Sequence, residues 1–284
     1  MVSPLLRKAA VNSLVEQGKC SYRCACRLVN ISRTASAYAS QRTEEEKGLV
    51  ERIKEMAHSH RRYGYRRIAN LLEQGGEKIN HKRVYRLWKI NGLSLKRRPR
   101  RKKIAVIKGE MKRTQYPNQV WSYDFMDDVT EKGRQIRILN VIDEFSRECL
   151  AIRTGSSITS QQVIEVLDYL ALTRGMAEYV RSDNGPEFIA KAVKEWIDKH
   201  GAKSIFISPG SPWENSYIES FNGKLRDECL NQEIFSSIEQ AGEVLENWRQ
   251  EYNNYRPHSA LGGISPQAYL KRYQENLKLE ALVT

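Results

Sequence analysis

Residues 120–128 read Val-Trp-Ser-Tyr-Asp-Phe-Met-Asp-Asp. Bulky and polar side chains alternate, so that Trp121, Tyr123 and Phe125 share one face while Asp124 lies on the other. A period of two residues is typical of a β-strand. The stretch therefore predicts a strand with its aromatic face in a core and a carboxylate on the opposite face.

The segments on the C-terminal side of this strand continue the same layout. They are strands at 135–142 and 148–153, a helix at 160–174, a strand at 179–183, a helix at 186–200 and a strand at 203–207. Three strands joined by short polar turns and followed by alternating helices and strands predict a mixed α/β domain.

Charge divides the chain of 284 residues into two unlike parts. Residues 1–119 hold 29 Lys and Arg against 9 Asp and Glu, whereas residues 120–284 hold 18 against 25. So large a basic excess in the first part favours a polyanionic partner, namely nucleic acid. No 18-residue stretch lacks charged residues, which argues against a membrane-spanning helix. The five cysteines indicate reduced thiols in the cytoplasm, and the spacing of Cys20, Cys24 and Cys26 does not favour zinc.

The basic part predicts two helical modules and a linker. Residues 1–40 form a small helix-turn-helix-like module, residues 41–95 a second DNA-binding module, and residues 96–116 a basic linker. In the second module, a helix between Asn80 and Gly92 has an apolar stripe and an acid-free outer face, as a DNA-contacting helix requires. The candidate DNA-binding residues of the helix and linker are Lys82, Arg83, Arg86, Lys89, Arg97, Arg98, Arg100 and Arg101.

Three acids are candidates for a metal site. Asp124 lies in the first strand, Asp183 ends a later strand, and Glu219 lies on a helix with 35 residues between it and Asp183. On that helix Glu219, Asn222 and Arg226 share a polar face opposite an apolar stripe. Converging carboxylates suit Mg²⁺ or Mn²⁺, and a nearby base suits a phosphate, so this pattern predicts phosphodiester chemistry.

Several segments carry a family resemblance. They are Trp121-Ser122-Tyr123-Asp124, Ile142-Asp143-Glu144-Phe145-Ser146-Arg147, Ser182-Asp183-Asn184-Gly185-Pro186-Glu187-Phe188, Glu214-Asn215-Ser216-Tyr217-Ile218-Glu219-Ser220-Phe221 and Tyr252-Asn253-Asn254-Tyr255-Arg256-Pro257-His258-Ser259-Ala260-Leu261-Gly262. Together they closely resemble bacterial insertion-sequence transposases of the OrfB type, whose catalytic core is related to that of retroviral integrases. The resemblance covers nearly the whole chain.

The resemblance implies a ribonuclease-H-like core over residues 117–284, with a C-terminal extension. In such a core a mixed five-stranded sheet is flanked by helices. It further implies that Asp124, Asp183 and Glu219 bind two divalent ions, that the enzyme cuts element ends and joins them to target DNA, and that Arg226 and Asn222 contact DNA. An OrfA-type partner or fusion, a homo-oligomer on DNA and a place in the bacterial cytoplasm with the nucleoid are also implied.

Two other functions are compatible with the same sequence. One is a DNA-binding regulator of transposition with an inactive core, which the complete set of three acids disfavours. The other is a phage- or integron-like integrase or a nuclease on the same fold. Within the core, Asp127 and Asp128 are expected at the surface, Asp143 in a turn, and His258 in a structural hydrogen bond.

Overall fold

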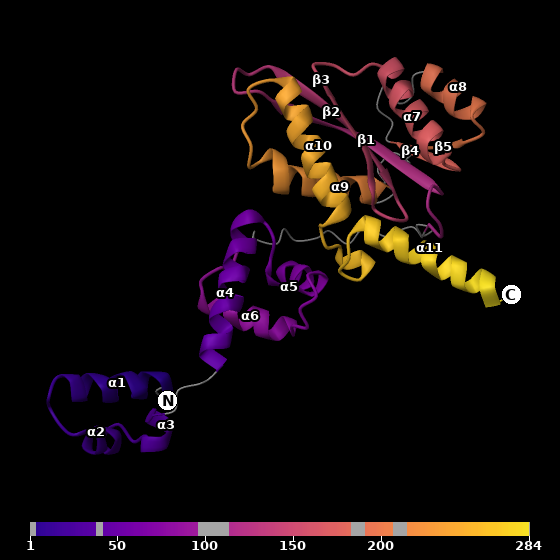
Figure 1. Cartoon of the computed structure of the whole chain (residues 1–284). Helices are drawn as coiled ribbons and strands as arrows, with labels where there is room; N and C mark the ends of the chain where they lie inside the picture. The colour runs from indigo at the N-terminus through magenta and orange to yellow at the C-terminus, as the bar shows by residue number, and fades with distance from the viewer. Residues whose placement is uncertain (1–3, 38–41, 96–113, 183–190, 207–214, 284) are drawn as a thin grey trace, which may run out of the picture. The chain divides into compact units, whose positions relative to one another are not determined.

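The computed structural model describes residues 4–37, 42–95, 114–182, 191–206 and 215–283 (Figure 1). It divides into two compact units, Met1–Glu55 and Met56–Thr284. The division falls within one helix, α4 (Arg42–Ser59). We describe each unit by itself.

The first unit consists of short helices around a small core. Its helices before α4 are α1 (Pro4–Glu16), α2 (Tyr22–Leu28) and α3 (Arg33–Ala37). The Ser21 hydroxyl accepts a hydrogen bond from the Cys24 backbone N–H, so Ser21 caps α2. Val11, Ala25 and Cys26 are buried together. These helices confirm the predicted all-α character of this region.

The second unit contains a five-stranded sheet of order β3-β2-β1-β4-β5. The strands are β1 (Val120–Val129), β2 (Gln135–Asp143), β3 (Cys149–Gly155), β4 (Tyr179–Ser182) and β5 (Lys203–Phe206). The first three pair antiparallel, whereas β4 pairs parallel with both β1 and β5. This is the mixed, ribonuclease-H-like sheet predicted from the sequence.

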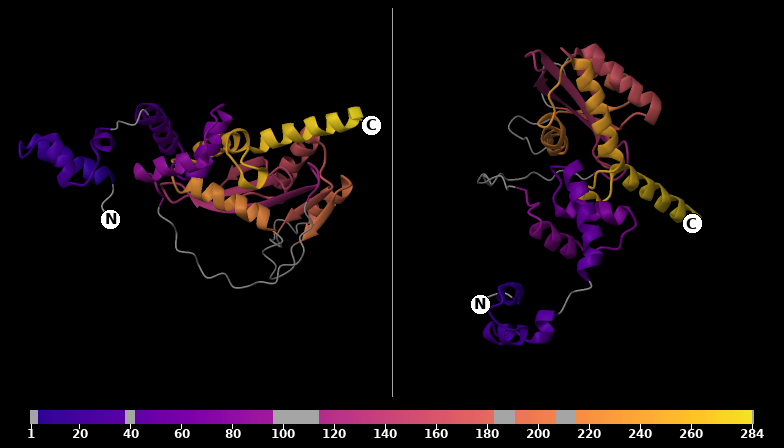
Figure 2. Two further views of the ribbon diagram at one scale, coloured as in Figure 1. Left: turned by 90° about the horizontal axis from the view of Figure 1, so that it is seen from below. Right: turned by 60° about the vertical axis from the view of Figure 1, so that its left-hand side comes forward.

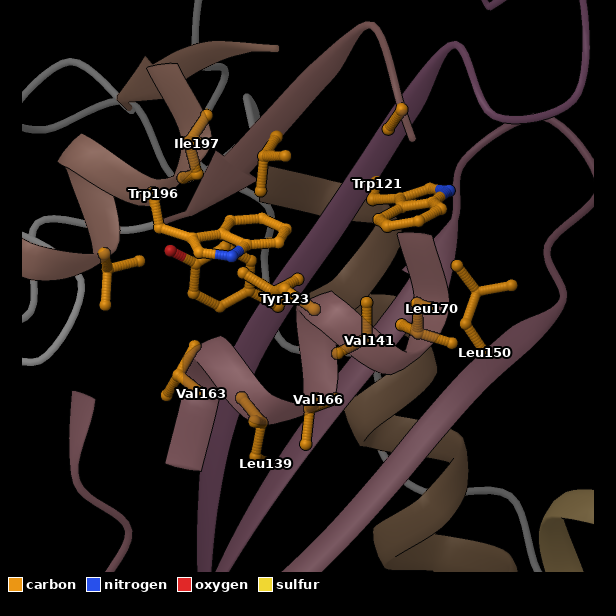
Figure 3. Close-up of a cluster of buried hydrophobic side chains, with 14 of the residues drawn as sticks. Trp121, Tyr123, Leu139, Val141, Leu150, Val163, Val166, Leu170, Trp196 and Ile197 are labelled. Carbon is orange, nitrogen blue, oxygen red and sulfur yellow. The ribbon is translucent and has the colours of Figure 1, made fainter. Parts of the chain in front are cut away.

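Helices cover both faces of the sheet (Figures 1 and 2). One face is covered by α7 (Ser160–Arg174) and α8 (Lys191–Lys199), the other by α9 (Ser216–Leu225) and α10 (Ile238–Asn254). Figure 3 shows Trp121 and Tyr123 of β1 packed among side chains of α7 and α8. The buried side chains on the two faces of the sheet form two hydrophobic clusters. Each fully buried aliphatic side chain stabilises the fold by about 1.5–3 kcal/mol, so the clusters determine which face of β1 carries Asp124.

The helix α9 continues into a π-helical turn, η2 (Arg226–Leu230). After α10 the chain forms a short 3-10 turn, η3 (Ser259–Leu261), and a final helix, α11 (Pro266–Val283). A π-helical turn shifts the residues that follow it relative to a regular helix, and such turns are frequent at functional sites. Here the π-helical turn comes directly after α9, the helix that carries Glu219.

Two further helices of the second unit are α5 (Tyr65–Gln74) and α6 (His81–Ile90). Asn80 caps α6, since its Oδ1 accepts from the Lys82 N–H at 2.8 Å. Val84, Leu87 and Trp88 are buried, while Lys82, Arg86 and Lys89 are exposed, as predicted.

Several contacts join α5 and the residues before it to the rest of the second unit. Arg62 pairs with Asp227, and Arg67 Nη1 donates to Glu228 Oε1 at 2.9 Å. Gly263, at φ +88°, packs so tightly against Asn70 that an added Cβ would overlap the amide. Within the described ranges, no helix is both long and apolar enough to cross a membrane.

Candidate active site

Asp124 lies in the middle of β1, on the sheet face that α9 covers. Its Oδ2 accepts a hydrogen bond from Asn222 Nδ2 at 2.8 Å. Its Oδ1 accepts from the backbone N–H of Phe125 at 2.8 Å. The carboxylate is therefore held in one orientation by its own strand and by α9.

Asn140 completes a chain of side-chain hydrogen bonds to this carboxylate. It lies opposite Asp124 on β2, is fully buried, and donates through Nδ2 to Asn222 Oδ1 at 2.8 Å. Asn140 is not among the site residues predicted from the sequence. The signal was present, however, because Asn140 is a lone amide in the apolar run Ile138-Leu139-Asn140-Val141-Ile142.

Glu219 lies one helical turn before Asn222 on α9, and its side chain is exposed. The apolar stripe of Ile218, Phe221 and Leu225 is buried against the sheet. Since residues three apart share a helix face, the hydrogen bond from Asn222 to Asp124 indicates that the Glu219 face of α9 is turned toward Asp124.

Asp183 lies outside the described residues, directly after Ser182, the last residue of β4. That strand pairs with β1 over Val120–Ser122, so the chain leaves β4 beside the strand that carries Asp124. Among the residues that are described, no three His, Cys, Asp or Glu side chains are grouped to hold a metal ion.

The other acids of β1 and β2 have structural partners. Asp127 Oδ2 accepts from Arg137 Nη1 at 2.6 Å, and Asp128 Oδ2 lies 3.4 Å from Arg226 Nη1. Arg226 Nη2 also donates to the Asp127 carbonyl at 2.6 Å. The base predicted to contact DNA is thus held at the end of β1.

Asp143 is the last residue of β2, and its carboxylate caps the turn that follows, as predicted. It accepts from the Asn118 N–H at 3.0 Å and from the Ser146 N–H at 2.8 Å. Burial raises the pKa of Asp143 despite these hydrogen bonds.

Of the predicted DNA-binding cations, Lys82, Arg86 and Lys89 share the exposed face of α6, with Arg83 half-buried beside them. The linker residues Arg97, Arg98, Arg100 and Arg101 lie outside the described residues. All five cysteines are free thiols.

A buried ionic network lies beneath the end of α9. Arg256 donates through Nε and Nη2 to the two carboxylate oxygens of Glu228, each at 2.6 Å. Arg67 also donates to Glu228, so one buried carboxylate serves two guanidinium groups. His258 is buried, and its Nε2 lies 3.5 Å from Arg256 Nη1, which agrees with the expected structural hydrogen bond. Burial, with Arg256 and Lys224 nearby, lowers the pKa of His258 to about 2, which keeps the ring neutral. In the sequence, the segment containing Arg256 and His258 stands out only as a family motif.

Comparisons with known proteins agree with this architecture. Residues 43–103 match the family "HTH-like domain", and residues 114–212 and 200–266 match two families described as "Integrase core domain". The chain is 40% identical over 273 residues to an uncharacterized 39.2 kDa protein of insertion element IS476 from Xanthomonas euvesicatoria, covering 96% of this chain and 79% of that one. It is 39% identical over 264 residues to an uncharacterized 31.7 kDa protein of insertion element IS407 from Burkholderia multivorans, covering 93% and 95%. The putative transposase InsK of IS150 from Escherichia coli is 28% identical over 263 residues, with coverage of 86% and 91%. The chain therefore belongs to the insertion-element transposases with an integrase core domain, and its function is that of a DDE-type DNA transposase.

Proposed function

We propose that Asp124, Asp183 and Glu219 form the catalytic site of this transposase and bind two divalent ions, Mg²⁺ or Mn²⁺. The observation that carries the assignment is the hydrogen bond from Asn222, one turn after Glu219, to the carboxylate of Asp124. It supports placing the two acids at one site, although they are 95 positions apart in the chain. The position of Asp183 at the end of the strand beside β1 is consistent with the same site.

The donor set fits a divalent cation. Integrase core domains are metal-dependent, and carboxylate oxygens are the ligands that Mg²⁺ and Mn²⁺ prefer. When bound, such ions activate the attacking oxygen and stabilise the leaving oxygen at phosphorus.

The chain's own contribution to this site is orientation. Asn222 fixes one oxygen of Asp124, and Asn140 fixes Asn222, so the carboxylate keeps its direction before DNA arrives. We assign Asn140 and Asn222 as positioning residues. Asn222 can also contact DNA at the edge of the site, as the sequence predicts.

DNA is expected to bind along the cations of α6, the linker bases and Arg226. The α6 cations meet the requirement for DNA contact because they are exposed on a helix anchored by Val84 and Trp88. The hydrogen bond from Arg226 to the Asp127 carbonyl supports a DNA contact of this base near the end of β1. We retain modules at residues 1–40 and 41–95, a linker at 96–116 and a core at 117–284 as the functional division.

The proposed assembly is a homo-oligomer on element-end and target DNA, with an OrfA-type partner or fusion, acting at the bacterial nucleoid. The basic balance of residues 1–119 supports the DNA partner.

The test of the site compares Glu219→Gln, Asp124→Asn and Asp183→Asn in Mg²⁺- or Mn²⁺-dependent nicking and joining of element-end DNA, with the OrfA partner supplied. Each change removes a charge at nearly constant size, so DNA binding should persist while both reactions fall by several orders of magnitude. Asp127→Asn is the matched control, because Asp127 is exposed on the same strand. Near-normal activity of Glu219→Gln would exclude the three-acid site. A wild-type chain that binds DNA yet never cuts it would favour the regulatory function.

The test of DNA binding measures affinity against salt. Replacing Lys82, Arg86 and Lys89 together by Ala should weaken binding and flatten the salt dependence, because each lost phosphate contact lowers the slope by about 0.9. An unchanged slope would remove α6 from the DNA interface.

A further inference from the structure

The second unit contains a cavity of about 760 Å³ on another side of α9 from Glu219. Its walls come from α5, from α9 and from the segment 256–263 that precedes α11. On α9 the cavity is lined by Ser216, Tyr217, Ser220 and Lys224, whereas Glu219 does not line it. One side of α9 therefore borders the cavity, and a different side carries Glu219, the proposed catalytic acid.

Positive charge dominates this cavity, which we call the basic cavity. The cations that line it are Arg66, Arg67, Arg147, Lys224 and Arg256, and the one acid in the lining that the structure describes is Glu73. Glu228, behind the wall, already accepts hydrogen bonds from Arg67 and Arg256. The cationic charge therefore exceeds the anionic charge around this space.

The excess of positive charge affects the pKa of Lys224. Burial and the nearby Arg256 lower the pKa of its ammonium group to about 8, although Glu228 acts in the opposite direction. An anion that enters the cavity stabilises a cation that is partly removed from water and lies beside other cations.

Arg147 is held at the cavity in an uncommon conformation. Its backbone has φ +63°, and its guanidinium lies 3.6 Å from the centre of the Tyr217 ring. Its Nη1 is buried and has no hydrogen-bond partner within the described part of the chain. A buried donor without a partner costs about 1–3 kcal/mol, which an incoming acceptor can offset. Left-handed backbone at a non-glycine residue also persists mainly where the surroundings impose it.

We propose that the basic cavity binds a backbone phosphate of a DNA strand, at a site separate from the carboxylate site. Guanidinium and ammonium groups recognise phosphate oxygens, and the hydroxyls of Ser216 and Ser220 add polar groups to the same wall. The volume exceeds that of a single phosphate ion, so it leaves room for the flanking sugar. This inference extends the DNA-binding function proposed above. It assigns the segment around Arg256 a part in holding substrate as well as in folding.

The first test is lysine footprinting of the full chain in EDTA, which removes catalysis from the experiment. Acetic anhydride labels accessible amines, and mass spectrometry compares Lys224 with Lys199 with and without duplex or single-stranded element-end DNA. Lys199 is the control because it is exposed in the last turn of α8. DNA should reduce labelling of Lys224 at least several-fold and leave Lys199 unchanged.

Three other outcomes would overturn the inference. Protection of Lys82 without protection of Lys224 would show that DNA binds at α6 and leaves the basic cavity empty. If DNA protects neither Lys82 nor Lys224, both this inference and the proposed DNA contact of α6 are wrong. Equal protection by inorganic phosphate, at the same concentration of phosphate groups, would identify a free-anion site instead of a strand site.

The second test uses Lys224→Gln and Arg66→Gln, with Lys199→Gln as the matched control. Arg66 is exposed at the cavity, so its replacement should leave folding intact. Each cavity variant should weaken DNA binding several-fold and lower the salt slope by about 0.7–0.9. If both variants bind DNA like Lys199→Gln, the basic cavity does not hold a phosphate.

Discussion

Replacing Glu228 by Gln removes the negative charge from the buried network of Arg256 and Arg67. The side chains of Arg256 and Glu228 are only 2% and 7% exposed, so solvent does little to compensate. Two hydrogen bonds of 2.6 Å and one of 2.9 Å end on this carboxylate. An amide oxygen can accept some of them, but the amide nitrogen would face a guanidinium donor.

Removing one partner of a buried ion pair costs about 3–5 kcal/mol, because the other charge stays buried. For a cooperative unit of 150–250 residues, each kcal/mol lowers Tm by about 2–4 °C. We therefore expect Glu228→Gln to lower the Tm of the unit Met56–Thr284 by about 6–20 °C.

Differential scanning calorimetry of the full chain measures this effect. Glu246→Gln is the matched control, since Glu246 is half exposed and its pair with Arg249 is a surface pair worth about 0–1 kcal/mol. The double variant Glu228→Leu with Arg256→Met should lose less stability than Glu228→Gln alone, because the buried Arg256 charge goes with its acid and only Arg67, whose side chain is 34% exposed, loses its partner. A Tm within about 2 °C of wild type for Glu228→Gln would refute the reasoning.

Three other substitutions test separate parts of the structure. The pKa of His258 is near 2 in the folded chain and near 6.5 in the unfolded chain, so between these values only the unfolded chain protonates the ring, and the free energy of unfolding falls as the pH falls. Urea titrations from pH 6.5 to 5 should therefore show a shallower fall in stability for His258→Gln than for wild type. Equal dependence of stability on pH in both proteins would contradict a buried neutral ring. Asn140→Leu should reduce cleavage by about 10–100-fold with DNA affinity kept and partial rescue at higher Mn²⁺, whereas full activity would deny it a positioning role. Gly263→Ala should destabilise by about 1–3 kcal/mol in denaturant through its positive φ and overlap with Asn70, and more than Gly262→Ala, which has the positive φ alone; equal losses would exclude the overlap.

The sheet was predictable because its signals are local. Alternation gave the face of β1 that carries Trp121 and Tyr123, and Thr159 with Gln162 forms a capping box at the predicted start of α7. The exposed cations of α6 followed from helical spacing in the same way. These features depend on neighbours within a few residues, which the sequence displays directly.

Long-range polar contacts were not predictable by the same means. Asn140 and Asn222 are 82 positions apart, and nothing in either segment specifies that one amide meets the other. Glu228, the partner of Arg256, lies in the π-helical turn η2, which no periodicity of the sequence indicates. A buried ion pair can be predicted from sequence only when both partners are known to meet. Here the helix α10 separates Glu228 from Arg256 in the chain.

The ion pairs from Arg62 and Arg67 to the turn after α9 limit how pieces of this family can be exchanged. A chimera that takes residues up to 95 from one relative and the core from this chain would keep Asp227 and Glu228 but replace Arg62 and Arg67 by whatever that relative carries. It would also separate Asn70 from the glycine that lets the two segments approach. Grafting a new DNA specificity onto this core therefore requires transplanting both sides of the junction together, or keeping α5 and replacing only the outward residues of α6.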